Sequence, residues 1–333
     1  MLHLSICRLM SALLLALGVG ALASPARAAD KLVFMTSWYA QAEHGGFYQA
    51  LASGLYEEEG LDVTIKMGGP QVNSMQLLLA GEADVYSGFD FRILSGVARD
   101  LPLVAIAAVF QHDMNGLITH PDVTGLDDIG DRSILMSASA RNSWWPWLRD
   151  KYGLSDDQVK RYTFNIQPFI RDPNAVQQAF GSSEPFVLKD MNVPYRFYAF
   201  ADQGYPPYGS TITTRRDVLV EKPDQLRRFL RASLKGWRDY LKDPALGNAL
   251  IKQENPKMTD QQLAFAVHHL RQANAVGSGD AAEQGIGTIT RERWRATYQY
   301  MVGAGLLPED TDWESAFTTD LIDGLGVMPT ASQ

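Results

Sequence analysis

Short segments with the pattern of β-strands alternate with segments of helical periodicity along most of this 333-residue chain. Residues 31–36, 61–66, 83–88 and 101–109 are apolar or alternate in polarity like strands, and apolar side chains within 47–55 repeat at helical spacing. The alternation stops at the Asp-, Gly- and Pro-rich segment 121–131 and restarts with a strand at 133–137 and a helix at 144–152. This pattern predicts open, mostly parallel sheets with helices on their faces.

The two runs of alternation predict two α/β lobes joined by two polar crossings. The first lobe would comprise residues 29–127 and 208–333, and the second lobe residues 128–207. Within the second lobe, Asp172 and Pro173 are expected to begin a helix that Gly181 ends. The last third of the chain reads as mainly helical, most clearly from Pro223 onward. A pair of crossings forms a hinge, so a ligand cleft is expected between the lobes.

Residues 1–28 have the three parts of a secretory signal peptide. A positively charged start precedes an apolar run from Met10 to Ala23, and the sequence Ala26-Arg27-Ala28 supplies the small residues of a cleavage site. The only cysteine, Cys7, lies in this segment. The mature protein is therefore expected in the periplasm, without a disulfide, a thiol nucleophile or a thiolate-bound metal.

Charge limits the partners of the mature chain. Removal of Arg8 and Arg27 with the signal peptide reduces the basic residues from 30 to 28, against 38 acidic residues, a balance of −10. Acidic charge spread over the whole chain argues against nucleic acid and anionic membrane as partners. It suits a soluble protein that diffuses freely as a monomer.

The window 38–48 follows the first expected strand and opens the first helix, so it lies at the carboxyl end of the sheet, where open α/β sheets bind ligands. Trp38, His44 and the pair Gly45-Gly46 could form a pocket wall, the glycines by letting backbone amides approach a ligand. The alternative is a plain strand–helix turn in which Trp38 only packs.

The motif Trp38-x-x-Gln-x-x-His44-Gly-Gly-Phe-Tyr resembles the opening of a known family. Gly-Gly-Pro-Gln-Val-Asn at 68–73, Ala-Gly-Glu-Ala-Asp at 80–84 and Ser-Glu-Pro-Phe at 183–186 fit the same family in order. These are the periplasmic binding proteins of ABC importers for nitrate, sulfonates, taurine and the pyrimidine precursors of thiamine. The resemblance implies two α/β lobes, each a mixed sheet flanked by helices, joined by a two-strand hinge.

The resemblance also implies a set of ligand contacts on both lobes. The first lobe would supply Trp38, His44, Gln71, Asn73, Phe89 and Asp90, and the second Ser137, Ser139 and Glu184. The pair Glu184-Pro185 resembles that of the pyrimidine binders, in which the carboxylate accepts hydrogen bonds from a ring amine. The alternative for Glu184 is a solvated acid at a helix end.

Aromatic residues indicate what the ligand could be. Trp144, Trp145 and Trp147 crowd one helix start, and Tyr205 and Tyr208 lie at the second crossing; Trp144 and Tyr208 are the candidates for stacking. A nitrate or sulfonate would need Arg or Lys forks, which are scarce near the expected cleft. A thiamine-precursor pyrimidine or a related flat ring is therefore favoured, with riboflavin, taurine or another sulfonate, and nitrate as alternatives. Core packing remains open for the clustered tryptophans.

Enzyme motifs are absent from the sequence. There is no nucleophile elbow, phosphate loop or dinucleotide fingerprint, and the adjacent pair His268-His269 cannot chelate one metal on a helix. The related eukaryotic pyrimidine synthases need a cysteine-rich motif that the mature chain lacks. No cofactor and no metal are expected, and the expected partners are a small-molecule ligand and an ABC transporter permease. A ligand-sensing partner of a membrane receptor is the other non-enzymatic interpretation.

Overall fold

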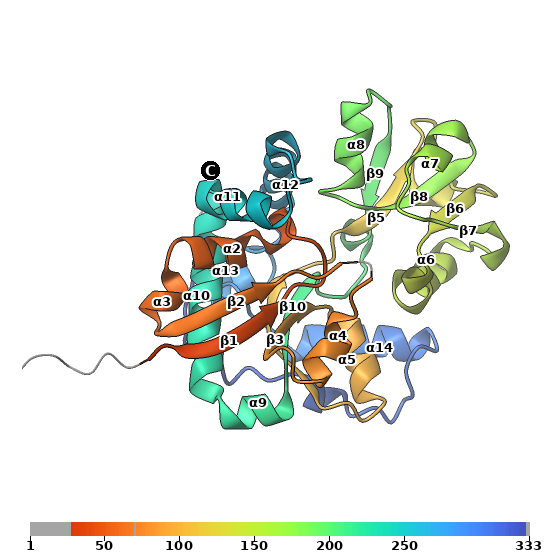
Figure 1. Cartoon of the computed structure of the whole chain (residues 1–333). Coiled ribbons are helices and arrows are strands. Elements are labelled where there is room, and N and C mark those ends of the chain that lie inside the picture. The colour runs from red at the N-terminus through yellow and green to blue at the C-terminus, as the bar shows by residue number, and fades with distance from the viewer. Residues whose placement is uncertain (1–27, 70, 331–333) are drawn as a thin grey trace, which may run out of the picture.

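Two five-stranded sheets, each in its own lobe, form the framework of the protein (Figure 1). The computed structural model describes residues 28–69 and 71–330. Residues 1–27 of the expected signal peptide therefore lie outside the described residues. The first sheet has the order β2-β1-β3-β10-β4, built from β1 (Asp30–Met35), β2 (Leu61–Lys66), β3 (Val85–Gly88), β4 (Leu103–Phe110) and β10 (Ser210–Arg215). The second has the order β7-β6-β8-β5-β9, built from β5 (Asn115–Thr119), β6 (Ser133–Met136), β7 (Val159–Arg161), β8 (Ala175–Phe180) and β9 (Arg196–Ala199).

Both sheets are mixed. Strands joined through helices pair in parallel, as β1 does with β2 and β3, and β6 with β7 and β8. Strands next to a crossing are antiparallel to their neighbours: β10 to β3 and β4, and β5 to β8 and β9. The expected architecture of two lobes, each a mixed sheet flanked by helices, is confirmed.

The first crossing comes earlier than the expected boundary near residue 127. Strand β5 belongs to the second sheet, so the chain leaves the first lobe between Phe110 and Asn115 and returns between Ala199 and Ser210. The polar break at 121–131 is instead a loop inside the second lobe, with a 3-10 helix, η2 (Leu126–Asp128). This crossing could not be located from local patterns, because only four residues separate β4 from β5 and none of them is Gly or Pro.

The helix expected from residue 172 is wrong, because this segment forms strand β8. It lies inside the second sheet between β6 and β5, with Ala175, Val176, Gln177 and Ala179 all buried. A strand buried on both faces loses the alternation of polarity that marks half-exposed strands. Pro173, taken for the first residue of a helix, stands in the turn before the strand.

Helices cover both sheets. In the first lobe they are α2 (Gly45–Ala52), α3 (Leu55–Glu58), α4 (Ser74–Leu79), α5 (Asp90–Val97), α9 (Arg216–Glu221), α10 (Pro223–Lys242), α11 (Ala245–Glu254), α12 (Asp260–Gln272), α13 (Ala281–Gln284) and α14 (Arg291–Gly303). In the second lobe they are α6 (Trp144–Tyr152), α7 (Gln167–Arg171) and α8 (Glu184–Asp190). Within the described residues, no helix combines the length and apolarity needed to cross a membrane.

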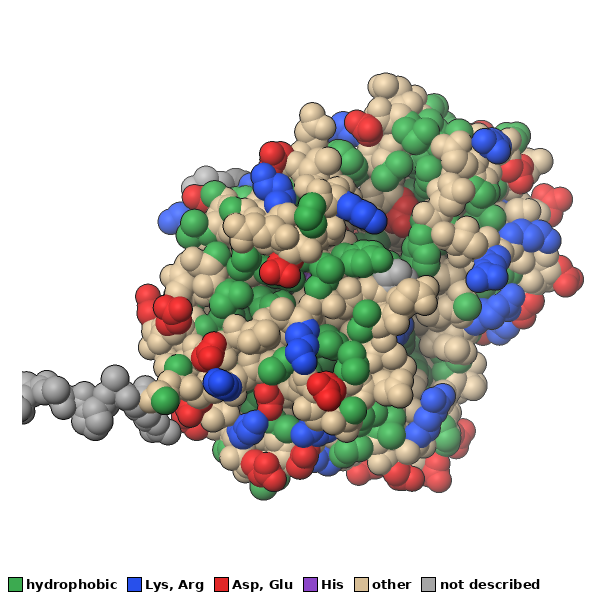
Figure 2. Space-filling view, in the orientation of Figure 1, with side chains coloured by type: hydrophobic (Ala, Val, Ile, Leu, Met, Phe, Trp, Pro, Cys, Tyr) green, Lys and Arg blue, Asp and Glu red, His purple; other side chains and the backbone are tan. Residues whose placement is uncertain are grey.

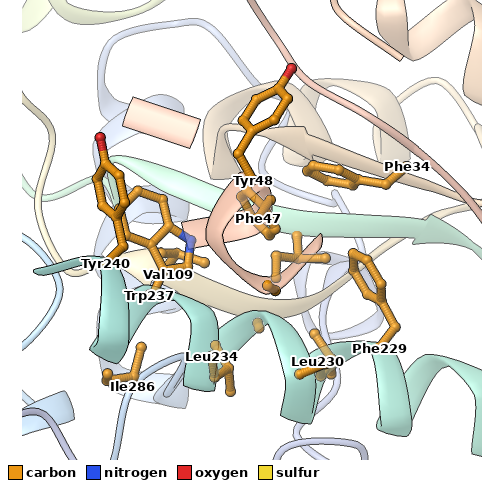
Figure 3. Packing of buried hydrophobic residues seen from close by; sticks show 14 of the residues in the cluster. Phe34, Phe47, Tyr48, Val109, Phe229, Leu230, Leu234, Trp237, Tyr240 and Ile286 are labelled. Carbon is orange, nitrogen blue, oxygen red and sulfur yellow. The ribbon is translucent and has the colours of Figure 1, made fainter. Parts of the chain in front are cut away.

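The pair Gly45-Gly46 packs against the hydrophobic core. The expectation that these glycines let backbone amides approach a ligand is therefore wrong. A Cβ on Gly46 would lie 2.1 Å from the ring of Trp237, and one on Gly45 would lie 2.1 Å from the ring of Tyr240. Helix α2 therefore packs with its backbone directly on aromatic side chains of α10 (Figure 3). This contact fixes the start of α2, and with it the turn that carries the residues facing the second lobe.

Candidate functional site

The surface is hollowed where the two lobes meet, and acidic and apolar side chains are visible in the hollow (Figure 2). Four turns at the carboxyl ends of strands lie at this junction. One follows β1 and contains the 3-10 helix η1 (Ala42–His44); the others follow β6, β7 and β8 in the second lobe. Carboxyl ends of parallel strands are where open α/β folds bind ligands, so we take this junction as the candidate site.

Glu43 joins the two lobes. Its side chain is buried in η1, and its carboxylate accepts a hydrogen bond from the hydroxyl of Ser182 in the turn after β8. Burial raises the pKa of Glu43, and the nearby charge of Glu184 raises it further. The sequence prediction missed this residue, although it lies inside the window 38–48 that was expected to form a pocket wall.

Glu184 is held rigidly at the start of α8. One carboxylate oxygen accepts a hydrogen bond from the hydroxyl of Tyr162 at 2.9 Å, and the other accepts one from the backbone N–H of Phe180 at 2.8 Å. Burial raises the pKa of this carboxyl as well. The half-buried side chain is thus fixed by protein groups rather than being a solvated acid.

His44 is neutral at physiological pH. Its side chain is only 3% exposed, and burial lowers its pKa to about 4. Its Nε2 lies 3.3 Å from the hydroxyl of Ser37. A neutral imidazole can give or accept a hydrogen bond but offers no positive charge.

Aromatic rings from both lobes meet beside these groups. The ring of Trp38 in the first lobe lies 5.5 Å from that of Phe164 in the second and 5.7 Å from that of Tyr39 (centroid distances). Phe164 also lies 5.2 Å from Tyr162, whose hydroxyl orients Glu184. The turn after β7 therefore links the aromatic wall to the carboxylate.

Three predicted contacts are buried within the lobes, and their ligand contacts stay predictions. Trp144 is 2% exposed and packs on Phe200 with ring centroids 4.8 Å apart, in the core of the second lobe. Tyr208 is fully buried in the first lobe. Asp90 is also fully buried and accepts hydrogen bonds from the backbone N–H of Tyr208 and the hydroxyl of Thr297, both at 2.9 Å. These side chains fill the core and secure the second crossing.

The remaining predicted residues lie in the expected loops, and their ligand contacts stay predictions. Gln71 and Asn73 are exposed, and Asn73 accepts a hydrogen bond from the backbone of α4 as its N-cap. Phe89 precedes α5 and is half-buried. The hydroxyls of Ser137 and Ser139 lie 2.9 Å apart at the carboxyl end of β6.

The site is acidic. Among residues 28–69 and 71–330, no Lys or Arg forms an ion pair with Glu43 or Glu184, and Arg141 pairs with the exposed Asp156. No group of three or more His, Cys, Asp or Glu side chains in the same part of the chain is placed to hold a metal ion. The arrangement offers two carboxyls, a neutral imidazole and several rings, which can hydrogen-bond N–H groups and stack on a flat molecule.

Two mixed sheets joined by a double crossing form the periplasmic-binding-protein fold. The chain belongs to the NMT1/THI5 like family, whose model matches residues 41–246. The aliphatic sulphonate binding protein SsuA of Escherichia coli superposes with a TM-score of 0.67 at 11% identity, covering 87% of this chain and 92% of its own.

Relatives with a stated activity fall into two groups. The riboflavin-binding protein RibY of Chloroflexus aurantiacus is 22% identical, over 89% of this chain and 87% of its own. The formylaminopyrimidine-binding protein of Halalkalibacterium halodurans is 23% identical, over 78% and 84%. The 4-amino-5-hydroxymethyl-2-methylpyrimidine phosphate synthase of Schizosaccharomyces pombe is 25% identical, over 65% and 67%. The chain is thus similar both to binding proteins and to a synthase.

Proposed function

We propose that the protein is the periplasmic substrate-binding component of an ABC importer, and that it captures a flat, amine-bearing heterocycle such as a thiamine-precursor pyrimidine. The observation that carries the proposal is the fixed carboxyl of Glu184, held by the ring hydroxyl of Tyr162 in the turn that meets Trp38 of the first lobe. A ligand with N–H groups on a flat ring matches both features. The relatives that bind formylaminopyrimidine and riboflavin support this class of ligand.

The geometry explains how such a ring would be selected. Glu184 already accepts one hydrogen bond on each oxygen, and each carboxylate oxygen can accept a second one from a ligand. An analogue without the amine would leave a buried carboxyl without that partner, which costs far more than losing a methylene contact. The rings add about 0.5–1.5 kcal/mol for each stacked pair beyond the burial of area.

The charge of the site argues against an anionic ligand. Nitrate or a sulfonate would lie near Glu43 and Glu184 with no Lys or Arg in the described residues paired to offset their charge. Like charges at short range disfavour binding in a buried site. The similarity to the sulphonate-binding protein therefore supports the fold and not that ligand.

No covalent chemistry is part of the proposal. Closure of the two lobes around the ligand would exclude water and present one surface to the transporter permease. Because a synthase is among the relatives, any pyrimidine that binds is recovered from the complex, and mass spectrometry checks that it is chemically unchanged.

The decisive experiment is thermal unfolding against a panel of solutes: formylaminopyrimidine, hydroxymethylpyrimidine, thiamine, riboflavin, taurine, an alkanesulfonate and nitrate. A ligand at 100 times its Kd stabilises by about 2.7 kcal/mol, a shift of several degrees. We expect a shift with an aminopyrimidine, lost in Glu184→Gln and kept in the exposed control Glu221→Gln. A shift with only sulfonate or nitrate would contradict the proposed ligand class, and chemical turnover of a bound pyrimidine would contradict the proposed transport role.

A further inference from the structure

Phe164 has an unusual backbone for a large side chain. Its φ is 60°, in the left-handed region that residues other than glycine, asparagine and aspartate rarely adopt. Its ring is also 58% exposed, which makes it one of the few large apolar side chains that reach solvent. A strained conformation that leaves an apolar ring in water gains nothing for the stability of the second lobe. Such outliers persist where the surrounding structure needs them.

The ring of Phe164 instead meets the first lobe. Its partner there is Trp38, at a centroid distance of 5.5 Å and an interplanar angle of 43°. The two residues come from turns at the carboxyl ends of strands in different sheets, so their contact bridges the mouth of the cleft. Because Phe164 is more than half exposed, it covers the entrance from outside and does not fill the interior.

We propose that Phe164 is the gate of the ligand cleft: its ring closes the entrance by packing on Trp38 and must swing away before a ligand enters or leaves. The inference rests on the proposed function and adds to it a residue that governs exchange of the ligand. Tyr162 lies in the same turn as Phe164, two residues earlier, and donates a hydrogen bond to Glu184. Movement of the gate is thereby coupled to the carboxyl that would bind the ligand.

A gate makes a kinetic prediction. Losing one aromatic pair of this kind corresponds to about a 2- to 10-fold change in a rate or equilibrium constant. Without the ring at the entrance, the association and dissociation rate constants of the ligand both rise by that factor, and the Kd changes little. Asparagine suits the left-handed backbone and removes the ring, whereas tyrosine keeps the ring.

Stopped-flow fluorescence with formylaminopyrimidine, and with riboflavin, measures both rate constants. We expect faster dissociation in Phe164→Asn, recovery in Phe164→Tyr, and no change in Met191→Ala, an exposed apolar side chain elsewhere in the second lobe. An unchanged dissociation rate in Phe164→Asn overturns the proposal. Tighter binding in Phe164→Asn also overturns it, because the ring would then occupy the place of the ligand.

A ligand-free experiment separates failure of this inference from failure of the proposed function. The double variant Trp38→Cys, Phe164→Cys is treated with a short bis-maleimide, and either single variant serves as the control. The closed gate predicts an intramolecular crosslink in the absence of any ligand, and lack of a crosslink overturns the inference. If neither pyrimidine nor riboflavin binds the unaltered protein, the proposed function fails, and the crosslink still decides whether the entrance is closed by this pair.

Discussion

Replacing Asp113 by asparagine should stabilise the protein at alkaline pH. Asp113 lies in the first crossing and is 1% exposed. One carboxylate oxygen accepts hydrogen bonds from the backbone N–H and side-chain amide of Asn115, at 2.7 and 2.6 Å. The other is buried without a hydrogen-bond partner among the described residues. Burial raises the pKa of Asp113 from 3.8 to about 7, and the nearby Asp90 adds to the rise.

The direction of the pH effect follows from proton binding. Between pH 3.8 and 7 the folded protein keeps a proton on Asp113 that the unfolded chain has lost, so the free energy of unfolding falls as the pH rises through this window and is level above it. A pKa difference of about 3 corresponds to about 4 kcal/mol. Asparagine cannot ionise and still accepts the hydrogen bonds from Asn115, so the variant avoids this loss.

Urea unfolding between pH 5 and 8.5 measures the effect. From pH 5 to 7 the contribution of Asp113 falls by about 2.7 kcal/mol, so we expect Asp113→Asn to lose about that much less than the unaltered protein and to be the more stable of the two at pH 8.5. Asp202→Asn, an exposed residue of the second crossing, is the control and should keep the pH dependence of the unaltered protein. A variant that is less stable than the unaltered protein at pH 8.5 would refute the reasoning.

Three further substitutions test the packing. Gly46→Ala should cost about 1–3 kcal/mol or more in urea unfolding, because its Cβ would overlap Trp237, whereas Gly303→Ala, with open space around it, should cost nothing. Gln177→Met should raise the unfolding free energy by about 1–3 kcal/mol, since this buried amide has no hydrogen-bond partner among the described residues. A lower unfolding free energy in the variant would contradict this and would indicate a bound water as the partner of the amide. Ser155→Ala should lower the unfolding free energy by about 1 kcal/mol, because it removes the capping box of the 3-10 helix that begins at Asp156. An unchanged midpoint of urea unfolding would contradict this.

Local patterns predicted most of the fold. The strand at 61–66 and the helix at 144–152 have the predicted bounds, because polarity and turn residues near each segment decide them. Thr259 caps helix α12, accepting a hydrogen bond from the backbone of Gln262, which is a local interaction of the same kind. Strand β8 and the position of the first crossing could not be read, because both depend on which strands lie beside them in space.

The site was harder to predict for the same reason. Trp144 and Glu184 each stand at the start of a helix with apolar neighbours, yet only the folded chain shows that Trp144 lies in a core and Glu184 lies near Glu43 of the other lobe. Glu43 and Phe164 acquire their significance from partners more than a hundred residues away, Ser182 and Trp38. A sequence pattern records what is near along the chain and leaves such pairs hidden.

The position of β10 in the first sheet also sets an order for folding. Strand β4 is apolar and buried along its whole length, and its only strand neighbour in the sheet is β10, which is made after the entire second lobe. A chain emerging from its N-terminus would expose β4 until Ser210 arrives, while residues 115–199 already contain every strand of the second sheet. Unpaired apolar strands are prone to aggregate. During synthesis, the second lobe can therefore complete its sheet first, whereas β4 stays without its strand partner until β10 has been made.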